Sequence, residues 1–410
     1  MNKASMGTRN EVIDRRRRAY QKACKREKGV ILNEICASTG LLRDRAARLL
    51  RQKVPGRSRG EPALRDGKPD GRGRKPLYRE QAVIRLLEML WEMMDFACGK
   101  RLCPGLSTLV DALRRHGELE ALNAPEWAIE QVLALSPATA DRLLVRARKA
   151  TTLRGRATTK SGTLRKKDIP IRLGNEWNEN APGFFEVDLV AHRGVTTAGE
   201  YCNTLDMTDI YSGWTETIAV RNKAQKHVFA GIKAVRARLP FPMRGIDSDN
   251  GGEFINDELY RYCQAEPQLL FTHSRPNKKN DNCHIEQKNF THVRRQLGYG
   301  RYESQAAANA MNHFYQVFRL YSNFFLPSAK LIEKQRLATH GPGAARIIKR
   351  YDPPASPFRR LMDSTHITPG EKDALQQLFL DLNPAALRRG MMELRERILA
   401  LALPNARPQN

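Results

Sequence analysis

The chain has 410 residues, too many for one ordinary domain, so two to four domains are expected. Lysine and arginine total 70 against 44 aspartates and glutamates, a formal net charge of +26. This excess favours a polyanionic partner, with nucleic acid first, over a merely solvated basic surface or a membrane-surface protein. No apolar run is long enough to span a membrane, so a cytoplasmic protein without a membrane partner is expected. The seven cysteines form no C-x-x-C pair, which argues against a disulfide framework or a zinc knuckle.

Residues 1–53 are predicted to form a small helical unit that binds DNA. Two short apolar stretches flank a turn that ends at Gly40, and the second stretch is rich in arginine. This pattern is typical of a helix-turn-helix, whose second helix enters the major groove. Arg43, Arg45 and Arg48 are the candidates for contacts with bases or phosphates. The alternative is a helical hairpin with a solvated arginine face.

Two basic linkers are predicted at residues 54–76 and 150–180. Both are rich in glycine, arginine and lysine, and such segments cannot bury a core. A linker of this composition can lie along phosphates, which gives salt-sensitive affinity without a choice of sequence.

Residues 77–149, between the linkers, are predicted to be helical. Apolar residues recur there at helical spacing, and Ser136 followed by proline marks the start of a helix that continues to about Lys149. The basic last helix predicts a second helix-turn-helix unit, in which Arg142 and Arg146 would contact DNA.

Residues 181–325 change to alternating strands and helices. Three strands come first, and antiparallel pairing is their simplest connection. The first of them, Phe184–Ala191, places Glu186 and Asp188 on one face. A helix, a fourth strand, a helix, a short fifth strand and a helix from about 281 to 297 follow. The order predicts an α/β core with a mixed five-stranded sheet and helices.

Three acidic residues in this region stand in distinctive surroundings. Asp188 lies on the first strand, Asp249 lies in the run SDNGGEF after the fourth strand, and Glu286 lies in the run IEQKN on the last helix. These segments resemble the catalytic core of the DDE transposases and retroviral-type integrases. The resemblance implies a ribonuclease H-like fold in which Asp188, Asp249 and Glu286 are both catalytic and metal-binding.

The chemistry of that family explains why three carboxylates suffice. Attack on a phosphodiester needs an activated oxygen, an in-line leaving oxygen and neutralised charge, which two divalent ions can provide. Mg²⁺, or Mn²⁺ in its place, takes one or two carboxylates beside waters and substrate oxygens. The resemblance implies that Asp188 bridges both ions, while Asp249 binds one and Glu286 the other. No small-molecule cofactor is implied.

Further charged residues surround these segments. Glu186, Asp247 and Asp281 are expected at the surface or as supports of the ligands. Asp206 and Asp209 are expected to close the turn before Trp214. Four basic residues are candidates for holding phosphates, with solvated charge as the alternative: Arg275, Lys278, Lys279 and Lys288.

Residues 326–410 are predicted to contain a basic hairpin across residues 341–343, followed by two helices. For the whole chain, the resemblance implies a transposase of a bacterial insertion sequence that is nucleoid-associated in the cytoplasm. It would bind element ends and target DNA as a homo-oligomer, nick the ends to a 3′-hydroxyl and join them to the target. The alternatives are a DNA-binding regulator with an inert ribonuclease H-like core, and a nuclease of the same fold that only hydrolyses.

Overall fold

The computed structural model divides the chain into two compact units, Met1–Lys75 and Pro76–Asn410, which are described separately. The described residues are 6–52, 78, 80–149, 171–172, 179–248, 251, 253–254, 257–266, 268–274, 283–337 and 346–403. The predicted linker 54–76 lies entirely outside them, as does most of 150–180. In the described part of the chain, no helix is both long and apolar enough to cross a membrane.

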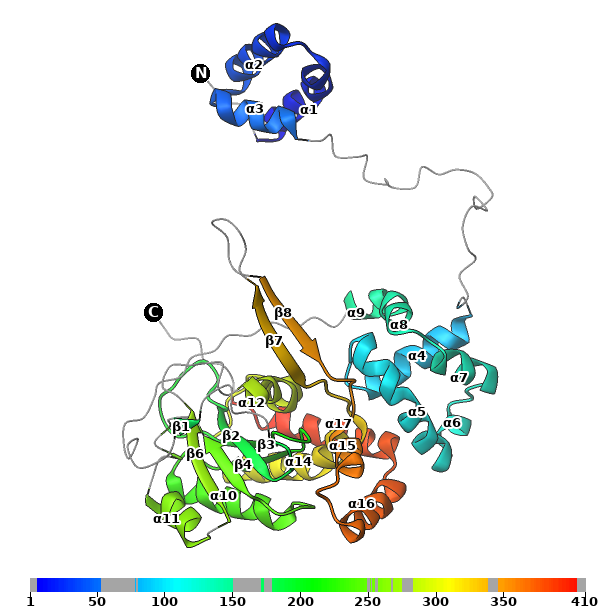
Figure 1. Ribbon diagram of the computed structural model, residues 1–410, viewed down its shortest axis with the longest axis vertical. Coiled ribbons are helices and arrows are strands. Elements are labelled where there is room, and N and C mark those ends of the chain that lie inside the picture. Colours follow the sequence, from blue (N-terminus) through cyan, green and yellow to red (C-terminus); the bar gives the residue numbers. More distant parts are fainter. Residues whose placement is uncertain are drawn as a thin grey trace. The chain divides into compact units, whose positions relative to one another are not determined.

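The first unit contains three helices, α1 (Met6–Lys22), α2 (Lys25–Thr39) and α3 (Arg43–Arg51) (Figure 1). They enclose a small core that includes Ile13, Ile35 and Leu50. Helix α2 ends at Gly40, whose φ of 66° lies in the left-handed region that glycine adopts without strain. The short link after it leads directly into α3. The last two helices are therefore joined by a turn with glycine, as the sequence indicates.

The second unit begins with six helices, α4 (Gln81–Met93), α5 (Gly99–Arg115), α6 (Glu118–Ala121), α7 (Glu126–Leu133), α8 (Pro137–Leu143) and α9 (Val145–Lys149). The single helix expected from Pro137 to Lys149 is in fact two. The break falls at the buried Leu144, and it lets Arg148 reach Asp141 at 2.6 Å. The apolar side chains of this region share one core with the rest of the unit.

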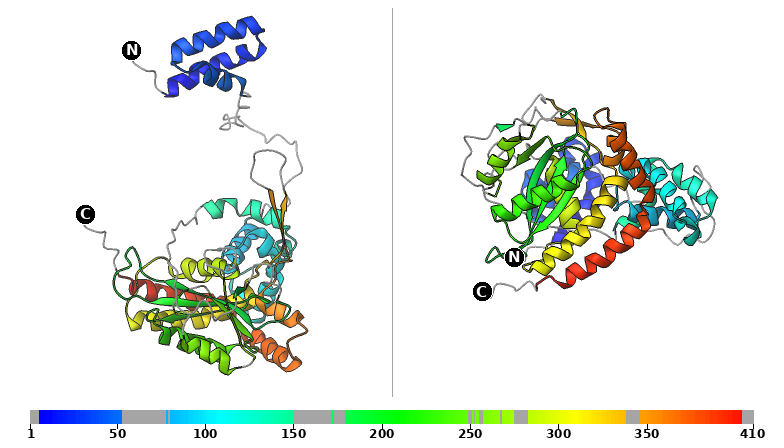
Figure 2. Two further views of the ribbon diagram at one scale, coloured as in Figure 1. Left: turned by 60° about the vertical axis from the view of Figure 1, so that its left-hand side comes forward. Right: turned by 90° about the horizontal axis from the view of Figure 1, so that it is seen from below.

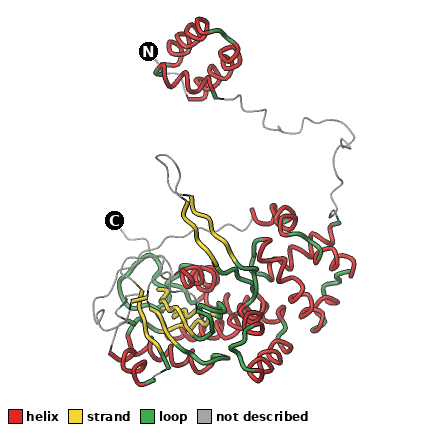
Figure 3. The backbone as a smooth tube through the Cα atoms, in the orientation of Figure 1, coloured by secondary structure: helices red, strands yellow, loops and turns green. Residues whose placement is uncertain are grey.

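The unit contains a six-stranded mixed sheet in the order β1-β6-β5-β2-β3-β4. Its strands are among those drawn yellow in Figure 3. They are β1 (Ile171–Arg172), β2 (Phe184–Ala191), β3 (Asn203–Asp209), β4 (Thr215–Val220), β5 (Gly245–Ser248) and β6 (Leu270–Ser274). Strands β2, β3 and β4 pair antiparallel, and β5 pairs parallel with β2 and β6. The five predicted strands are thus confirmed. The sixth, β1, pairs with β6 in a segment expected to be linker.

Helices cover both faces of the sheet. On one face lie α10 (Gln225–Arg238) and α11 (Asp257–Ala265), and Gly231 of α10 closely approaches Leu205 and Ile218. The predicted helix 281–297 covers the other face in three parts: α12 (Cys283–Lys288), the π-helix η1 (Asn289–Arg294) and α13 (Arg295–Leu297). This arrangement of strands and helices is consistent with a ribonuclease H-like core.

The C-terminal part holds α14 (Gln305–Phe325), the strands β7 (Leu331–Leu337) and β8 (Arg346–Tyr351), and the helices α15 (Pro357–Asp363), α16 (Pro369–Asp381) and α17 (Pro384–Ala400). Strands β7 and β8 pair antiparallel, as the predicted hairpin requires. Helix α15 was not predicted. It begins at Ser356, whose hydroxyl accepts a hydrogen bond from the Arg359 amide.

Helix α14 takes the place of a seventh strand along the edge of β4. The amide side chain of Asn323 accepts from Thr215 N and donates to Thr215 O, at 2.8 and 2.9 Å. Asn312 makes the same pair of bonds with Ala219, at 2.7 and 2.9 Å. Two asparagines about three helical turns apart therefore satisfy the backbone groups of two residues that lie four positions apart on the strand.

We expect Asn323→Ala to lower the free energy of unfolding by about 1–3 kcal/mol, because it leaves a buried amide and a buried carbonyl without partners. Asn309→Ala, at an exposed position of the same helix, is the matched control and should change it by less than about 0.5 kcal/mol. Urea denaturation of both variants measures this, and equal effects would contradict the role given to Asn323.

Candidate active site

Asp188 lies at the centre of the sheet, on the face that α12 and η1 cover. The β2–β3 register places it directly opposite Asp206. Its two carboxylate oxygens accept hydrogen bonds from Asn289 Nδ2 at 2.6 Å and from the Leu189 amide at 2.8 Å. Asn289 is the first residue of the π-helix, a type of segment that is frequent at functional sites. Asp188 is half-buried, so its carboxylate is fixed but still accessible.

The expectation that Asp206 closes the turn before Trp214 is wrong. It lies within β3, is fully buried, and has no hydrogen-bond partner for either carboxylate oxygen among the described residues. Burial raises its pKa well above the ordinary value, and the charge of Lys288 opposes this increase. The alternation of β3 places Asp206 on one face of that strand, but only the β2–β3 register sets it against Asp188.

Asp209 closes the β3–β4 turn, as expected. Its oxygens accept from the Gly183 amide at 2.8 Å, from the Ser212 amide at 2.7 Å and from the Ser212 hydroxyl at 2.5 Å. Burial raises its pKa to about 6, although these hydrogen bonds act in the opposite direction. The turn also needs Gly213, whose φ is 75°.

Glu186 and Asp247 are both buried, so neither lies at the surface. Glu186 accepts a hydrogen bond from the Ile285 amide at 2.8 Å and so ties α12 to β2. Asp247 lies opposite Glu186 in the parallel register and accepts a hydrogen bond from the Thr272 hydroxyl. These acids hold the helix and strands around Asp188. Asp281 lies outside the described residues.

Lys288 extends from the end of α12 toward the same region and is half-buried. Its ammonium donates to the carbonyl of Gly213 at 3.3 Å. Burial lowers its pKa to about 8, and the neighbouring Asp206 acts in the opposite direction. Lys288 therefore places a positive charge inside the acidic face of the sheet, and a contact with phosphate stays a prediction.

The remaining predicted residues are placed only in part. Asp249 lies outside the described residues, and the strand that leads to it ends at Ser248, which pairs with Val187. Glu286 belongs to α12, but its side chain is outside the described residues. Among the side chains that are described, no three His, Cys, Asp or Glu residues form a metal-binding group. The structure therefore leaves the proposed triad untested.

Five of the predicted DNA-binding arginines lie in the described part of the chain. Arg43, Arg45 and Arg48 are exposed on α3, and Arg142 and Arg146 are exposed on α8 and α9. Three other predicted residues lie outside the described part of the chain: Arg275, Lys278 and Lys279.

A chain of buried polar groups continues the acidic face beyond Asp188. The hydroxyl of Thr204 contacts His192 Nε2 and the Tyr315 hydroxyl, each at 2.8 Å. His192 is fully buried, and burial lowers its pKa to about 3, with Arg294 acting in the same direction. His192 is therefore neutral at physiological pH.

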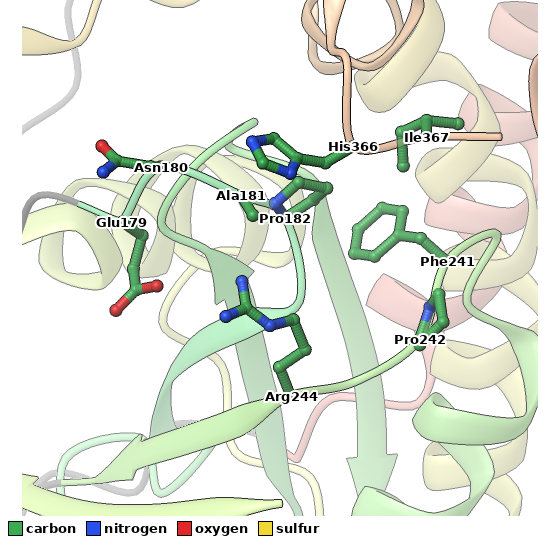
Figure 4. Close-up of a pocket in the computed structure, with 9 residues that line it drawn as sticks. All are labelled: Glu179, Asn180, Ala181, Pro182, Phe241, Pro242, Arg244, His366 and Ile367. Carbon is green, nitrogen blue, oxygen red and sulfur yellow. The ribbon is translucent and has the colours of Figure 1, made fainter. Parts of the chain in front are cut away.

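A pocket of about 460 Å³ lies at the opposite end of the sheet (Figure 4). Its lining comes from the segments that precede β2 and β5, including Pro182 and Arg244, and from His366 and Ile367 between α15 and α16. It is thus separate from Asp188, which lies beyond the carboxyl end of β5.

Comparison with known proteins places the chain in a family. It is 38% identical over 358 residues to the uncharacterized protein y4rM of Sinorhizobium fredii, covering 87% of this chain and 95% of that protein. The chain therefore belongs to the same family as y4rM. No protein-family model matches it.

Solved structures that align with the chain include retroviral integrases. The catalytic core of BIV integrase is 16% identical, covering 28% of this chain and 66% of that one, just under two thirds, with a TM-score of 0.22. The HTLV-2 core in complex with magnesium is 15% identical, covering 28% and 70%, with a TM-score of 0.23. A simian T-cell lymphotropic virus intasome is 15% identical, covering 45% and 59%, with a TM-score of 0.25. Alignments with TM-scores this low do not assign a fold on their own.

We expect the free energy of unfolding to decrease as the pH falls, because buried His192 is neutral in the folded protein. Its folded-state pKa of about 3 lies below the ordinary 6.5, so the stability it contributes is complete above pH 6.5 and is lost as the pH falls toward 3. The loss should approach about 1.4 kcal/mol per pH unit. His192→Gln should remove this part of the slope between pH 6 and 4, as measured by urea denaturation. His366→Gln, at an exposed position, should keep the wild-type slope; parallel slopes in all three proteins would contradict the assignment.

Proposed function

We propose that this chain is a DDE-type transposase, a metal-dependent polynucleotidyl transferase that nicks DNA and joins the freed end to a target. The observation that carries the proposal is the position of Asp188. It lies on the strand between β3 and β5, and the helix that contains Glu286 is hydrogen-bonded to that same strand through Glu186. Strands β2 and β5 and helix α12 are thus neighbours, which supports the proposal that they supply the three family acids.

The described residues fit a hard divalent cation near Asp188. Carboxylate oxygens are the donors that Mg²⁺ and Mn²⁺ prefer. The buried, unpartnered oxygens of Asp206 beside Asp188 are a polar group that a cation would stabilise. In the proposal Asp188, Asp249 and Glu286 hold two ions, which when bound supply neutralisation of charge at the reacting phosphate.

The protein's own groups position this site. Asn289 orients the Asp188 carboxylate through its 2.6 Å hydrogen bond, and Glu186 fixes the start of α12. Lys288 adds a positive charge that offsets the clustered acids. DNA would be recognised through exposed arginines, including Arg45 on α3 and Arg146 on α9, and the net charge of +26 favours such a partner. A homo-oligomer would hold two element ends together, and target DNA would be the second substrate.

We expect the purified protein to join a labelled duplex, taken from the DNA that borders its own gene, to a plasmid in the presence of Mg²⁺ or Mn²⁺. Asp188→Asn should reduce joining to background while DNA binding persists, because an amide cannot replace an anionic ligand. Asn289→Ala should reduce joining roughly 10–100-fold, as for residues that orient ligands. Asp381→Asn, at an exposed position of α16, is the matched control and should retain activity.

Other outcomes would select a different function. DNA binding without cleavage, equal in wild type and Asp188→Asn, would leave the regulator with an inert core. Metal-dependent cleavage without a joined product would identify a nuclease that only hydrolyses.

A further inference from the structure

The strands β7 and β8 form a ribbon that stands out from the rest of the second unit (Figures 1 and 2). The sheet has only these two strands, and its described side chains are largely exposed. Ile332 and Tyr351, both large and apolar, are 67% and 52% exposed. A two-stranded ribbon is only marginally stable by itself in water. The ribbon therefore leaves two large apolar side chains open to solvent.

The two faces of the ribbon differ in charge. On one face Glu333 pairs with Arg350, with 3.4 Å between Oε2 and a guanidinium nitrogen. On the other face the register sets Lys334 directly opposite Lys349. Like charges at directly opposed positions destabilise a sheet unless an anion lies between or above them. Tyr351 shares this lysine face, because it lies two residues from Lys349 along the strand.

The root of the ribbon, at Lys330 and Asp352, is fixed to the β3–β4 turn, which lies beside the start of β2. Three consecutive carbonyls of the β3–β4 turn accept from three different segments. Lys330 Nζ donates to Tyr211 at 2.5 Å, Arg360 to Ser212 at 3.3 Å, and Lys288 to Gly213 at 3.3 Å. The ribbon and the helix that carries Glu286 are thus held by one turn.

Asp352, the residue after β8, completes this root. It forms an ion pair of 2.9 Å with Arg360, whose side chain is only 10% exposed, and its amide donates to the Lys330 carbonyl at 2.9 Å. Arg360 also donates to the Ser328 carbonyl at 2.6 Å. A root buried in this way gives the ribbon a set direction relative to the sheet.

We propose that the lysine face of the ribbon binds duplex DNA, on a ribbon that is tied to the helix carrying Glu286 through the shared β3–β4 turn. Phosphates would neutralise the opposed pair of Lys334 and Lys349, and a two-stranded ribbon fits the major groove of B-DNA. Ile332 and Tyr351 would supply apolar contacts with sugars and base edges. The ribbon is a DNA contact beyond the helical units. It rests on the proposed function only in taking DNA as the partner.

The test compares two double variants of the full chain that each lose two positive charges. Lys334→Ala/Lys349→Ala changes the lysine face. Arg359→Ala/Arg397→Ala removes two exposed arginines from helical ion pairs on α15 and α17 and is the matched control. Binding to a fluorescent 30-base-pair duplex would be measured by anisotropy over a range of salt concentrations. Thermal unfolding would establish that both variants are folded.

We expect the ribbon variant to bind DNA about tenfold more weakly near physiological salt. The plot of the logarithm of its association constant against the logarithm of the salt concentration should have a negative slope that is smaller in magnitude by about 2. The control should keep the wild-type affinity and slope. Equal behaviour of the two variants would overturn the ribbon proposal, as would a loss confined to duplex RNA. These results are independent of catalysis: failure of the wild type to cleave or join DNA would overturn the proposed function, while a ribbon-specific loss of binding would still support this inference.

Discussion

Burial of carboxylates is the constraint that shapes this sheet, because a charge removed from water must be paired, hydrogen-bonded or neutralised. Glu216 is fully buried and is neutralised by Arg238 and Arg319, each at 2.7 Å. Asp209 is satisfied by amides and a hydroxyl of its own turn. Asp206 differs, since no described residue hydrogen-bonds its oxygens. Among the described residues, Asp206 is thus a buried acid beside Asp188 that is offset by the charge of Lys288 rather than by a hydrogen-bonded partner.

The β3–β4 turn connects parts of the chain that are distant in sequence. Backbone carbonyls accept from side chains without changing the local conformation, so one short turn can fix several elements at once. Here the turn accepts hydrogen bonds from Lys288 of α12, from Lys330 at the root of the ribbon and from Arg360 of α15. A shift of DNA on the ribbon would therefore act on the same backbone that supports the helix carrying Glu286.

Much of this core could be predicted from the sequence because its signals are local. Alternating residues define β2, and the runs around Asp249 and Glu286 carry the family resemblance. Three features could not be read in this way. Strand β1 has two residues and exists only through pairing with β6. The break at Leu144 depends on burial against other helices. The position of Asp206 depends on the register of two strands, which a single sequence fixes only once the turn is known. The side chains of Asp249 and Glu286 lie outside the described residues, so the candidate triad still rests on the resemblance.

The asparagines of α14 have a consequence for how copies of this protein can associate. An open sheet edge presents unpaired amides and carbonyls, on which a strand from another molecule can add. On β4 the groups of Thr215 and Ala219 are already occupied by Asn323 and Asn312, and the carbonyl of Thr217 accepts from Arg238 at 2.8 Å. Growth of the sheet across this edge is therefore blocked, and a strand of another copy cannot extend the sheet beyond β4.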